Sequence, residues 1–175
     1  RIVSEHGWAD LVGPTVCRTL TPDEVAVVRG KLGPDPLNAD ADPGQFYRAA
    51  AKSSRPIGVI LMDQAAISGV GNIFRAESLY RQKIDPLRPG KTLSDDELRR
   101  LWDDNKHLLT IGVRVGRIIT TEQQDRPGIP ETEAWPDHAN YVYMRHGQKC
   151  PRCSATIRME EIAGRKLYWC PGCQK

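Results

Sequence analysis

The sequence predicts a mainly α-helical protein that ends in a small metal-bound β-hairpin. Two observations support the helices: helix-capping sequences recur along the chain, and apolar residues follow them at steps of three and four. The hairpin is predicted from two Cys-x-x-Cys pairs, Cys150 with Cys153 and Cys170 with Cys173, which sixteen residues separate. Each pair presents two thiolates on one tight turn, and a hairpin brings the pairs together as four tetrahedral ligands. Such a closed set leaves no position for substrate, so the metal is expected to be structural.

One Zn²⁺ ion is the metal that this cysteine pattern favours, with rubredoxin-like iron as the main rival. Two disulfides are the other interpretation. They are disfavoured because the sequence has no secretory signal and no thioredoxin-like surroundings for a redox bridge. Cys17 lies outside the pattern and is expected to be a small buried hydrophobic residue. This use of cysteine fits a reducing cytosol, and no apolar run has membrane-spanning length.

The opening residues 1–16 contain apolar side chains without helical spacing and no initiator methionine. Residues 1–3 read as the end of a strand whose partners lie upstream, so the chain is expected to begin inside a larger protein.

Three helices are predicted next, all with core-facing apolar residues. Thr21 and Glu24 form a capping box around Pro22, and residues 33–36 (GPDP) end that helix. Asp42 and Pro43 begin a second helix in the same way, and residues 55–56 (RP) begin a shorter third segment. The residues expected in the core are Val25, Val28, Leu32, Phe46, Ala49, Ala50, Ile57, Ile60 and Leu61.

A glycine-rich turn, residues 68–72 (SGVGN), leads directly into a convincing helix at residues 73–83. A turn of this kind exposes unpaired backbone N–H groups at the helix N-terminus, where an anion can bind, and Asn72 adds a side-chain donor. Glycines used only for close helix packing are the other interpretation, and the turn by itself leaves both open.

A capping box at residues 94–97 (SDDE) begins a long helix predicted to run to about Ile119, with Gly112 and Gly116 as weak points. Residues 120–137 lose periodicity and contain three prolines, which is typical of a linker or an extended loop. Residues 141–145 alternate like a strand. Residues 156–159 and 166–169 read as the hairpin strands, with the turn at residues 163–165.

Positive charge is concentrated at the C-terminal end. Residues 140–175 hold seven basic and two acidic residues, whereas the remainder holds 18 basic and 20 acidic, within a formal net charge of +3. A small metal-bound module with this excess is typical of a surface that contacts a polyanion, although a merely soluble surface is the alternative.

A series of motifs occurs in a fixed order along the chain: LMDQ at 61–64, GVGNI at 69–73, ESL at 77–79, IDP at 84–86, VY at 142–143, Arg145, Gly147, Cys150, Cys153, Gly164, Arg165, Tyr168 and CPGCQK at 170–175. Together these motifs resemble the formamidopyrimidine-DNA glycosylase and endonuclease VIII family over about residues 15–175. The resemblance implies a helix-two-turns-helix domain at residues 19–137 and a four-cysteine zinc finger at residues 138–175. Residues 1–18 would be the remnant of an upstream β-rich domain and its linker.

The resemblance also implies an activity and its residues. The family excises oxidised bases from double-stranded DNA and cleaves the resulting abasic site. Gly71, through its amide, and Asn72, through its side chain, would hold a phosphate beside the lesion. Arg165 would grip the phosphates that flank the flipped nucleotide, and it would assist the elimination as a catalytic residue. Donors on two separate supports would kink the duplex so that the damaged nucleotide swings out.

The departure from the family lies at the start of the chain. The family's nucleophile is an N-terminal proline amine followed by glutamate, whereas this sequence begins with Arg1 and Ile2. The chain is therefore expected to bind and kink damaged DNA without excising bases, as a cytoplasmic, nucleoid-associated bacterial monomer whose catalytic domain lies elsewhere in the parent protein. The alternatives are a non-catalytic zinc-dependent binder of bent or damaged DNA, and a generic zinc ribbon.

Overall fold

The computed structural model describes residues 1–12 and 17–175, which fall into two compact units, Arg1–Lys31 and Leu32–Lys175. The expected domain boundaries after residues 18 and 137 stay predictions. The part of the expected N-terminal remnant that covers residues 13–16 lies outside the described residues. The first unit contains an antiparallel hairpin of β1 (Ile2–Ser4) and β2 (Gly7–Ala9), followed by α1 (Pro22–Arg29).

Three expectations for this first unit differ from the structure, although its helix start is confirmed. Thr21 accepts a hydrogen bond from the Glu24 amide, and the Glu24 carboxylate accepts one from the Thr21 amide, so the capping box forms as predicted. However, α1 ends at Arg29 and buries none of its residues, so it has no core face. Cys17 is exposed rather than buried. The strand at the start of the chain finds its partner within the chain, in β2.

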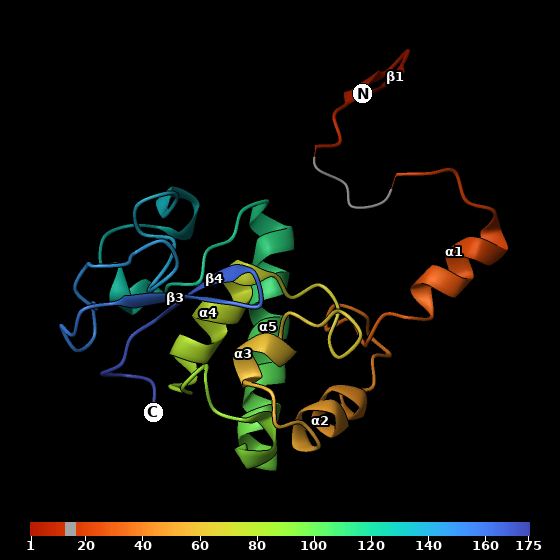
Figure 1. Ribbon diagram of the computed structural model, residues 1–175. Helices are drawn as coiled ribbons and strands as arrows, with labels where there is room; N and C mark the ends of the chain where they lie inside the picture. The colour runs from red at the N-terminus through yellow and green to blue at the C-terminus, as the bar shows by residue number, and fades with distance from the viewer. Residues whose placement is uncertain (13–16) are drawn as a thin grey trace. The chain divides into compact units, whose positions relative to one another are not determined.

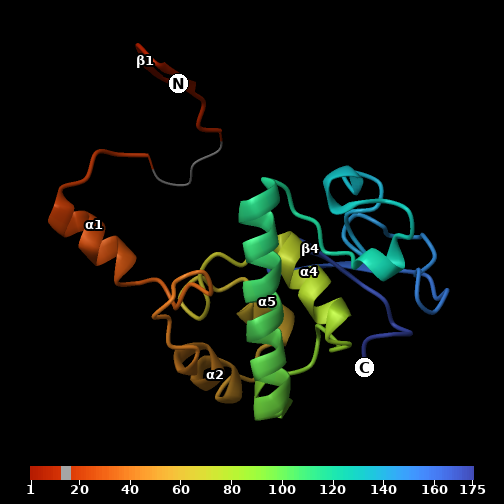
Figure 2. The same cartoon turned by 180° about the vertical axis from the view of Figure 1, so that it is seen from behind.

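The second unit is built around the longest helix, α5 (Asp95–Val115), as Figures 1 and 2 show. Its other helices are α2 (Gly44–Ala51), α3 (Ile57–Ile60) and α4 (Asn72–Arg81), together with the short 3₁₀ helix η1 (Gly90–Thr92). In both views α4 lies alongside α5, and α2 lies near the first turns of α5. The helical fold class predicted from the sequence is confirmed.

One hydrophobic core joins these helices. It contains apolar residues of α2, α3, α4 and α5, and the Phe46 and Trp102 rings lie 6.4 Å apart between α2 and α5. The predicted core residues Phe46, Ala50, Ile57, Ile60 and Leu61 are all fully buried. Helical spacing found these positions because a helix that packs on a neighbour buries one continuous stripe of its surface.

The long helix begins as predicted and ends earlier than predicted. Ser94 and Glu97 form the expected capping box. The helix stops at Val115 because Gly116 takes a left-handed conformation (φ 70°), and its amide donates to the carbonyl of Gly112. A glycine in this conformation is a common helix end, since no Cβ opposes it. Val113, an apolar residue in the last turn of this helix, is 73% exposed.

The C-terminal hairpin forms as predicted, from β3 (Arg158–Ile162) paired antiparallel with β4 (Arg165–Trp169). The strand expected at residues 141–145 is wrong, since this segment forms turns. The reason is Glu77 on α4, whose carboxylate accepts hydrogen bonds from the amides of Tyr141, Val142 and Tyr143 at 2.7–2.8 Å. A buried side chain replaces the neighbouring strand as the partner of these amides.

The segment expected to be a linker or an extended loop packs as part of the second unit. It contains the 3₁₀ helices η2 (Gln123–Asp125) and η3 (Glu131–Glu133), and its residues Ala134 and Ala139 pack with Ile119 in a small separate core. Among the described residues, none of the helices combines the length and the apolar character that crossing a membrane requires.

Candidate nucleic-acid interface and zinc site

The four zinc-pattern cysteines gather at one end of the hairpin. Their Sγ atoms all lie within 4.8 Å of one another, with Cys150 and Cys173 at 3.7 Å and Cys153 and Cys170 at 3.3 Å. Four sulfurs at about 2.3 Å from a tetrahedral Zn²⁺ lie roughly 3.8 Å apart, so the cluster fits one such ion. All five cysteines of the chain are free thiols, which excludes the disulfide interpretation in this structure.

The charge state of these sulfurs also fits a cation. Burial opposes ionisation of Cys150, but hydrogen bonds from the Tyr80 hydroxyl and from the amides of Arg152 and Cys153 lower its pKa to about 7. Burial, then the neighbouring cysteine sulfurs, raises the pKa of both Cys170 and Cys173. Four crowded sulfurs therefore cannot all ionise alone, whereas a dication stabilises the full set of thiolates.

The zinc hairpin is attached to α4 by buried polar contacts. Glu77, fully buried, accepts the three amide hydrogen bonds described above and a fourth from the Thr120 hydroxyl. Just beyond the C-terminal end of α4, Gln174 donates to the carbonyl of Ile84 and accepts from the amide of Cys170. The finger is therefore held against the middle of α4 and against the segment that follows this helix.

The glycine-rich turn places an open helix N-terminus on the surface. Gln64 fixes the turn by accepting from the Gly69 amide and donating to the Val70 carbonyl. Gly71 is the N-cap of α4, and no side chain of the described ranges, 1–12 and 17–175, caps this helix. A Cβ added to Gly71 would meet nothing within 4 Å, so packing within the chain does not require glycine there. The position is open to the close approach of an external group.

The structure brings the three predicted DNA-contact residues together. The Asn72 side-chain amide donates a 2.9 Å hydrogen bond to the carbonyl of Lys166, the residue that follows Arg165 in β4. The hairpin turn before Arg165 uses Ala163 and Gly164 with positive φ (52° and 72°). Arg165 itself is exposed.

Sequence reasoning missed Arg75, which lies at the centre of this arrangement. Its guanidinium donates to the Asn72 side-chain oxygen, to the Lys166 carbonyl at 3.3 Å and to the Gly58 carbonyl at 3.3 Å. Arg75 is 1% exposed, and its Nε has no hydrogen-bond partner among the residues that the structure describes. The signal in the sequence is its position three residues after Asn72, which puts both side chains on one face of α4.

No carboxylate of the described residues forms an ion pair with Arg75. Burial, followed by the nearby positive charge of Arg165, lowers the pKa of Arg75 to about 10, so it remains charged at neutral pH. A buried guanidinium is ordinarily paired, because desolvating an unpaired charge is costly. The site therefore has the electrostatic character of a place for an anion.

A groove runs beside this turn. Ile73, which follows Asn72, lines a cavity of about 350 Å³ together with Trp135, Tyr143, Met144 and Arg145. Ile73 and Trp135 also line an adjoining cavity of about 360 Å³. Trp135 is 42% exposed and Met144 is 71% exposed, and Met144 has a positive φ of 58°. The groove presents aromatic and apolar surface next to the anion site.

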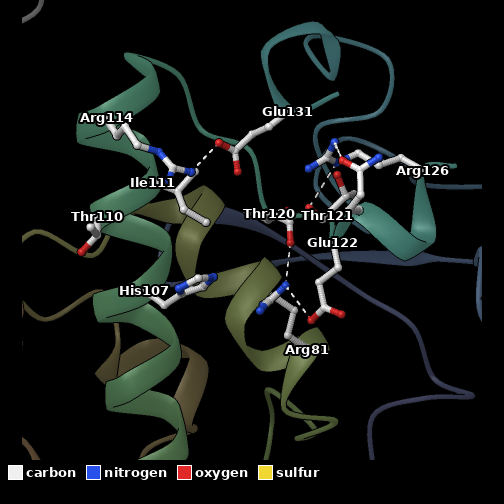
Figure 3. Close-up of a pocket in the computed structure, with 11 residues that line it drawn as sticks. Arg81, His107, Thr110, Ile111, Arg114, Thr120, Thr121, Glu122, Arg126 and Glu131 are labelled. Carbon is white, nitrogen blue, oxygen red and sulfur yellow. Dashed lines mark hydrogen bonds and ion pairs between the residues drawn. The ribbon is translucent and has the colours of Figure 1, made fainter. Parts of the chain in front are cut away.

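A larger cavity, about 440 Å³, lies elsewhere and contains none of the predicted site residues (Figure 3). Two of its arginines pair with carboxylates, Arg114 with Glu131 at 2.5 Å and Arg81 with Glu122 at 3.3 Å. A third, Arg126, is 5% exposed and, among the described residues, donates only to neutral oxygens of Thr121, Gln123 and Ile129.

Comparisons with known proteins agree with this arrangement. Residues 32–124 match the formamidopyrimidine-DNA glycosylase H2TH domain, and residues 147–175 match the zinc finger found in FPG and IleRS. The finger match and the four-cysteine cluster together favour one structural zinc ion over iron.

Relatives and solved structures cover most of the chain. "Endonuclease 8 1" of Mycobacterium tuberculosis is 43% identical over 175 residues, which cover 99% of this chain and 65% of that protein. The formamidopyrimidine-DNA glycosylase of Thermus thermophilus is 38% identical over 150 residues, which cover 82% of this chain and 54% of that protein. A complex between the Lactococcus lactis Fpg and abasic-site DNA superposes with a TM-score of 0.70 at 28% identity, covering 89% of this chain and 57% of that one.

The chain spans just under two thirds of the length of the endonuclease 8 relatives that it matches. The helical match covers more than half of the chain, and the finger match follows it in the same order as the two motifs predicted from the sequence. The chain therefore belongs to the formamidopyrimidine-DNA glycosylase and endonuclease VIII family, of which it carries the helix-two-turns-helix domain and the zinc finger.

Proposed function

We propose that this chain is the DNA-binding part of a base-excision-repair glycosylase and AP lyase that acts on oxidised bases, and that it holds damaged duplex DNA by its phosphates. The observation that carries the proposal is the unpaired charge of Arg75 beside an uncapped helix N-terminus, with Arg165 close by. A phosphate at the Gly71 amide would supply the missing negative charge. Base edges are not needed for this contact, so it would carry no sequence preference.

Each predicted residue has a separate role in the proposal. The Gly71 amide and the second hydrogen of the Asn72 side-chain amide face one phosphate, because the first hydrogen is used by Lys166. Arg165 is held next to Asn72 by the hydrogen bond between the Asn72 side chain and the carbonyl of Lys166. In the proposal it binds the neighbouring phosphate and assists elimination, as the family resemblance implies. Cys150, Cys153, Cys170 and Cys173 bind the zinc ion that keeps the hairpin folded. Gripping two adjacent phosphates bends the strand and favours eversion of the nucleotide.

The groove that begins at Ile73 fits an everted base. A nucleotide whose phosphate sits at Asn72 has its base within reach of the adjoining cavity, and the exposed Trp135 ring offers a face for stacking. Stacking of a base on an aromatic side chain contributes about 1–3 kcal/mol and tolerates different bases.

The test measures binding of the 175-residue chain to a duplex that contains an abasic-site analogue. Fluorescence anisotropy at several salt concentrations gives the affinity. Asn72→Ala is expected to weaken binding by about 1–3 kcal/mol, the range for losing a charge-assisted hydrogen bond. Arg165→Ala should weaken binding and reduce the slope of log affinity against log salt by about 1.

Arg158→Ala is the matched control, because Arg158 is an exposed arginine of the same hairpin at the start of β3, far along the strand from the turn. Zinc content is measured for each variant, since Asn72 also anchors the hairpin. If the Asn72 and Arg165 variants bind as tightly as the parent chain, the proposed phosphate site is wrong.

For catalysis, the proposal is that the 175-residue polypeptide by itself binds but does not excise 8-oxoguanine or oxidised pyrimidines. Excision in this family needs a terminal proline amine as nucleophile, and the internal prolines of this sequence have no free amine. Slow cleavage of a preformed abasic site remains open to the Arg1 amine or to Lys166, since a primary amine forms an imine with the sugar aldehyde. Multiple-turnover release of a base by this polypeptide would contradict the proposal. The protein is further proposed to be a cytoplasmic, nucleoid-associated monomer.

A further inference from the structure

A phenol on α4 points at the zinc cluster. The Tyr80 hydroxyl lies 3.2 Å from the Cys150 Sγ, and this is its hydrogen-bond partner among the residues that the structure describes. Tyr80 is 0% exposed, so its hydroxyl is shielded from bulk water. A metal-bound cysteine is a thiolate, which accepts hydrogen bonds and has none to donate, so the O–H group donates to the sulfur.

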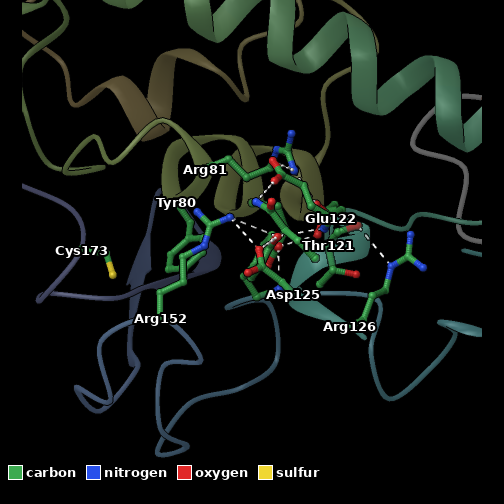
Figure 4. Close-up of polar contacts among 12 residues, drawn as sticks. Tyr80, Arg81, Thr121, Glu122, Asp125, Arg126, Arg152 and Cys173 are labelled. Carbon is green, nitrogen blue, oxygen red and sulfur yellow. Dashed lines mark hydrogen bonds and ion pairs between the residues drawn. The ribbon is translucent and has the colours of Figure 1, made fainter. Parts of the chain in front are cut away.

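The ring is held so that its hydroxyl keeps this direction. Tyr141 stacks on Tyr80 with ring centroids 4.9 Å apart and planes inclined by 29°. The Arg152 guanidinium lies over both rings, 5.4 Å from the Tyr80 centroid and 4.6 Å from that of Tyr141. Asp125 pairs with Arg152 at 2.8 Å, and Figure 4 shows Arg152 reaching from below Tyr80 toward Asp125.

Arg152 belongs to the zinc knuckle itself, because it lies between Cys150 and Cys153 in the sequence. The knuckle therefore supplies both the sulfur that accepts the hydrogen bond and the cation that fixes the donor ring. The four zinc-site cysteines differ in this respect: within the described ranges, only Cys150 has a side-chain hydroxyl donor, and Cys153 is exposed.

We propose that Tyr80 is a positioning residue for the zinc site, whose hydroxyl withdraws charge from the Cys150 thiolate and slows loss of the metal. A hydrogen bond to a ligand atom orients that ligand and reduces its reactivity toward protons, chelators and electrophiles. Removing such a partner typically weakens metal binding by about 10–100-fold. The proposal concerns this chain's own hairpin and does not depend on what the chain binds.

The experiment compares Tyr80→Phe with Tyr168→Phe in the zinc-loaded 175-residue chain. Tyr168 lies in the same hydrophobic cluster, and its hydroxyl has no hydrogen-bond partner in the described part of the chain, which makes it the matched control. The rate of zinc transfer to a chromogenic chelator is expected to rise about tenfold or more for Tyr80→Phe and to stay at the parent value for Tyr168→Phe.

A spectroscopic readout separates this role from a merely structural one. In the Co²⁺-substituted protein, losing the hydrogen bond raises the energy of the sulfur lone pairs, so the thiolate-to-cobalt charge-transfer band should shift to lower energy in Tyr80→Phe. A general loosening of the hairpin speeds metal release without moving the band. Replacing Tyr80 by 3-fluorotyrosine keeps the shape, strengthens the donor and should shift the band the other way, which also covers failure of the phenylalanine variant to fold. A band and a release rate equal to those of the parent in both variants would overturn the proposal.

Discussion

At the scale of single residues, Arg75 has opposite expected effects on folding stability and on DNA binding. Its guanidinium is buried and charged, and its three hydrogen bonds go to neutral oxygens rather than to a carboxylate. Burying a charge without a counter-charge costs free energy of folding, and a hydrophobic residue of similar volume avoids that cost. The chain retains a destabilising group at the place where the proposed phosphate would sit, which is common at functional sites.

The first prediction follows from this conflict. Without DNA, Arg75→Met should leave the free energy of unfolding unchanged or raise it by about 1 kcal/mol. The same variant should bind the abasic duplex more weakly by about 1–3 kcal/mol, because the phosphate loses a nearby charge and Asn72 loses its orienting partner. Urea denaturation and fluorescence anisotropy measure the two quantities.

Arg100→Met is the control for this prediction, since Arg100 is an exposed arginine paired with Asp96 at the start of α5. It should change each quantity by less than about 0.5 kcal/mol. The interpretation of Arg75 fails if its variant loses more than about 2 kcal/mol of stability while binding DNA like the parent chain.

At the scale of elements, α5 is held at its start by a carboxylate with two tasks. Glu97 closes the capping box by accepting from the Ser94 amide at 2.8 Å, and it pairs with Arg88 at 2.7 Å. The Arg88 hydrogen bond, against the opposing effect of burial, lowers the pKa of Glu97 from 4.5 to about 2. Because the folded pKa lies below the unfolded one, the stabilisation is complete above pH 4.5 and disappears as the pH falls toward 2.

The second prediction is that Glu97→Gln lowers the free energy of unfolding by about 1–2 kcal/mol at pH 7. This difference from the parent chain should shrink as the pH falls below 4.5. Denaturation at matched pH values measures it, and loss of zinc at low pH affects both proteins alike. Asp95→Asn, at an exposed first-turn position without a side-chain contact in the described residues, should show a much smaller effect. A Glu97→Gln difference that persists at pH 2 would contradict the assignment.

Sequence patterns of neighbouring residues predicted the elements whose hydrogen bonds form between residues close in the chain. They failed where a side chain distant in the sequence determines the backbone conformation. The capping boxes at Thr21 and Ser94 and the cysteine hairpin are read from neighbouring residues, and all three form. The strand expected at residues 141–145 does not form, because Glu77, more than sixty residues away, takes up its amides. The three expected DNA-contact residues lie close together in the structure. Arg75 was missed because its importance depends on its burial without a carboxylate partner among the described residues, and burial and pairing are set by the tertiary structure.

The third prediction concerns that distant side chain. Glu77→Gln replaces one acceptor oxygen by an NH₂ group that faces backbone donors, which leaves buried N–H groups unsatisfied. The free energy of unfolding should fall by about 2–4 kcal/mol, and hydrogen exchange at the amides of Tyr141, Val142 and Tyr143 should accelerate. Glu160→Gln, at an exposed position of β3, should change neither quantity. Unaltered exchange protection at these three amides would show that Glu77 does not hold the segment.

At the scale of the whole second unit, α4 is the element that joins its parts. Its first residues form the open turn at Gly71 and Asn72, its middle carries Glu77, and Tyr80 near its end faces the zinc cluster. The helical core is separate from the cluster of apolar residues around the zinc site, although both include residues of α4. Metal loss should therefore damage the finger directly and the helical core only through α4.

The last prediction tests this division by removing zinc. Binding of a structural zinc ion supplies about 10–16 kcal/mol in small finger peptides, far more than a hairpin of this size gains from its own packing. A strong chelator, or Cys153→Ser, should unfold residues from about 141 onward while α2, α3 and α5 keep their helical signal and exchange protection, because their core contains no finger residue. Affinity for the abasic duplex should fall when the metal is removed, since Arg165 and the Lys166 carbonyl that anchors Asn72 both belong to the hairpin.

Metal analysis should find one zinc per chain in protein purified without chelators. Circular dichroism and hydrogen exchange decide the outcome: cooperative loss of all helical signal would mean that the two cores are not separable, and an unchanged hairpin without metal would mean that zinc does not fold it.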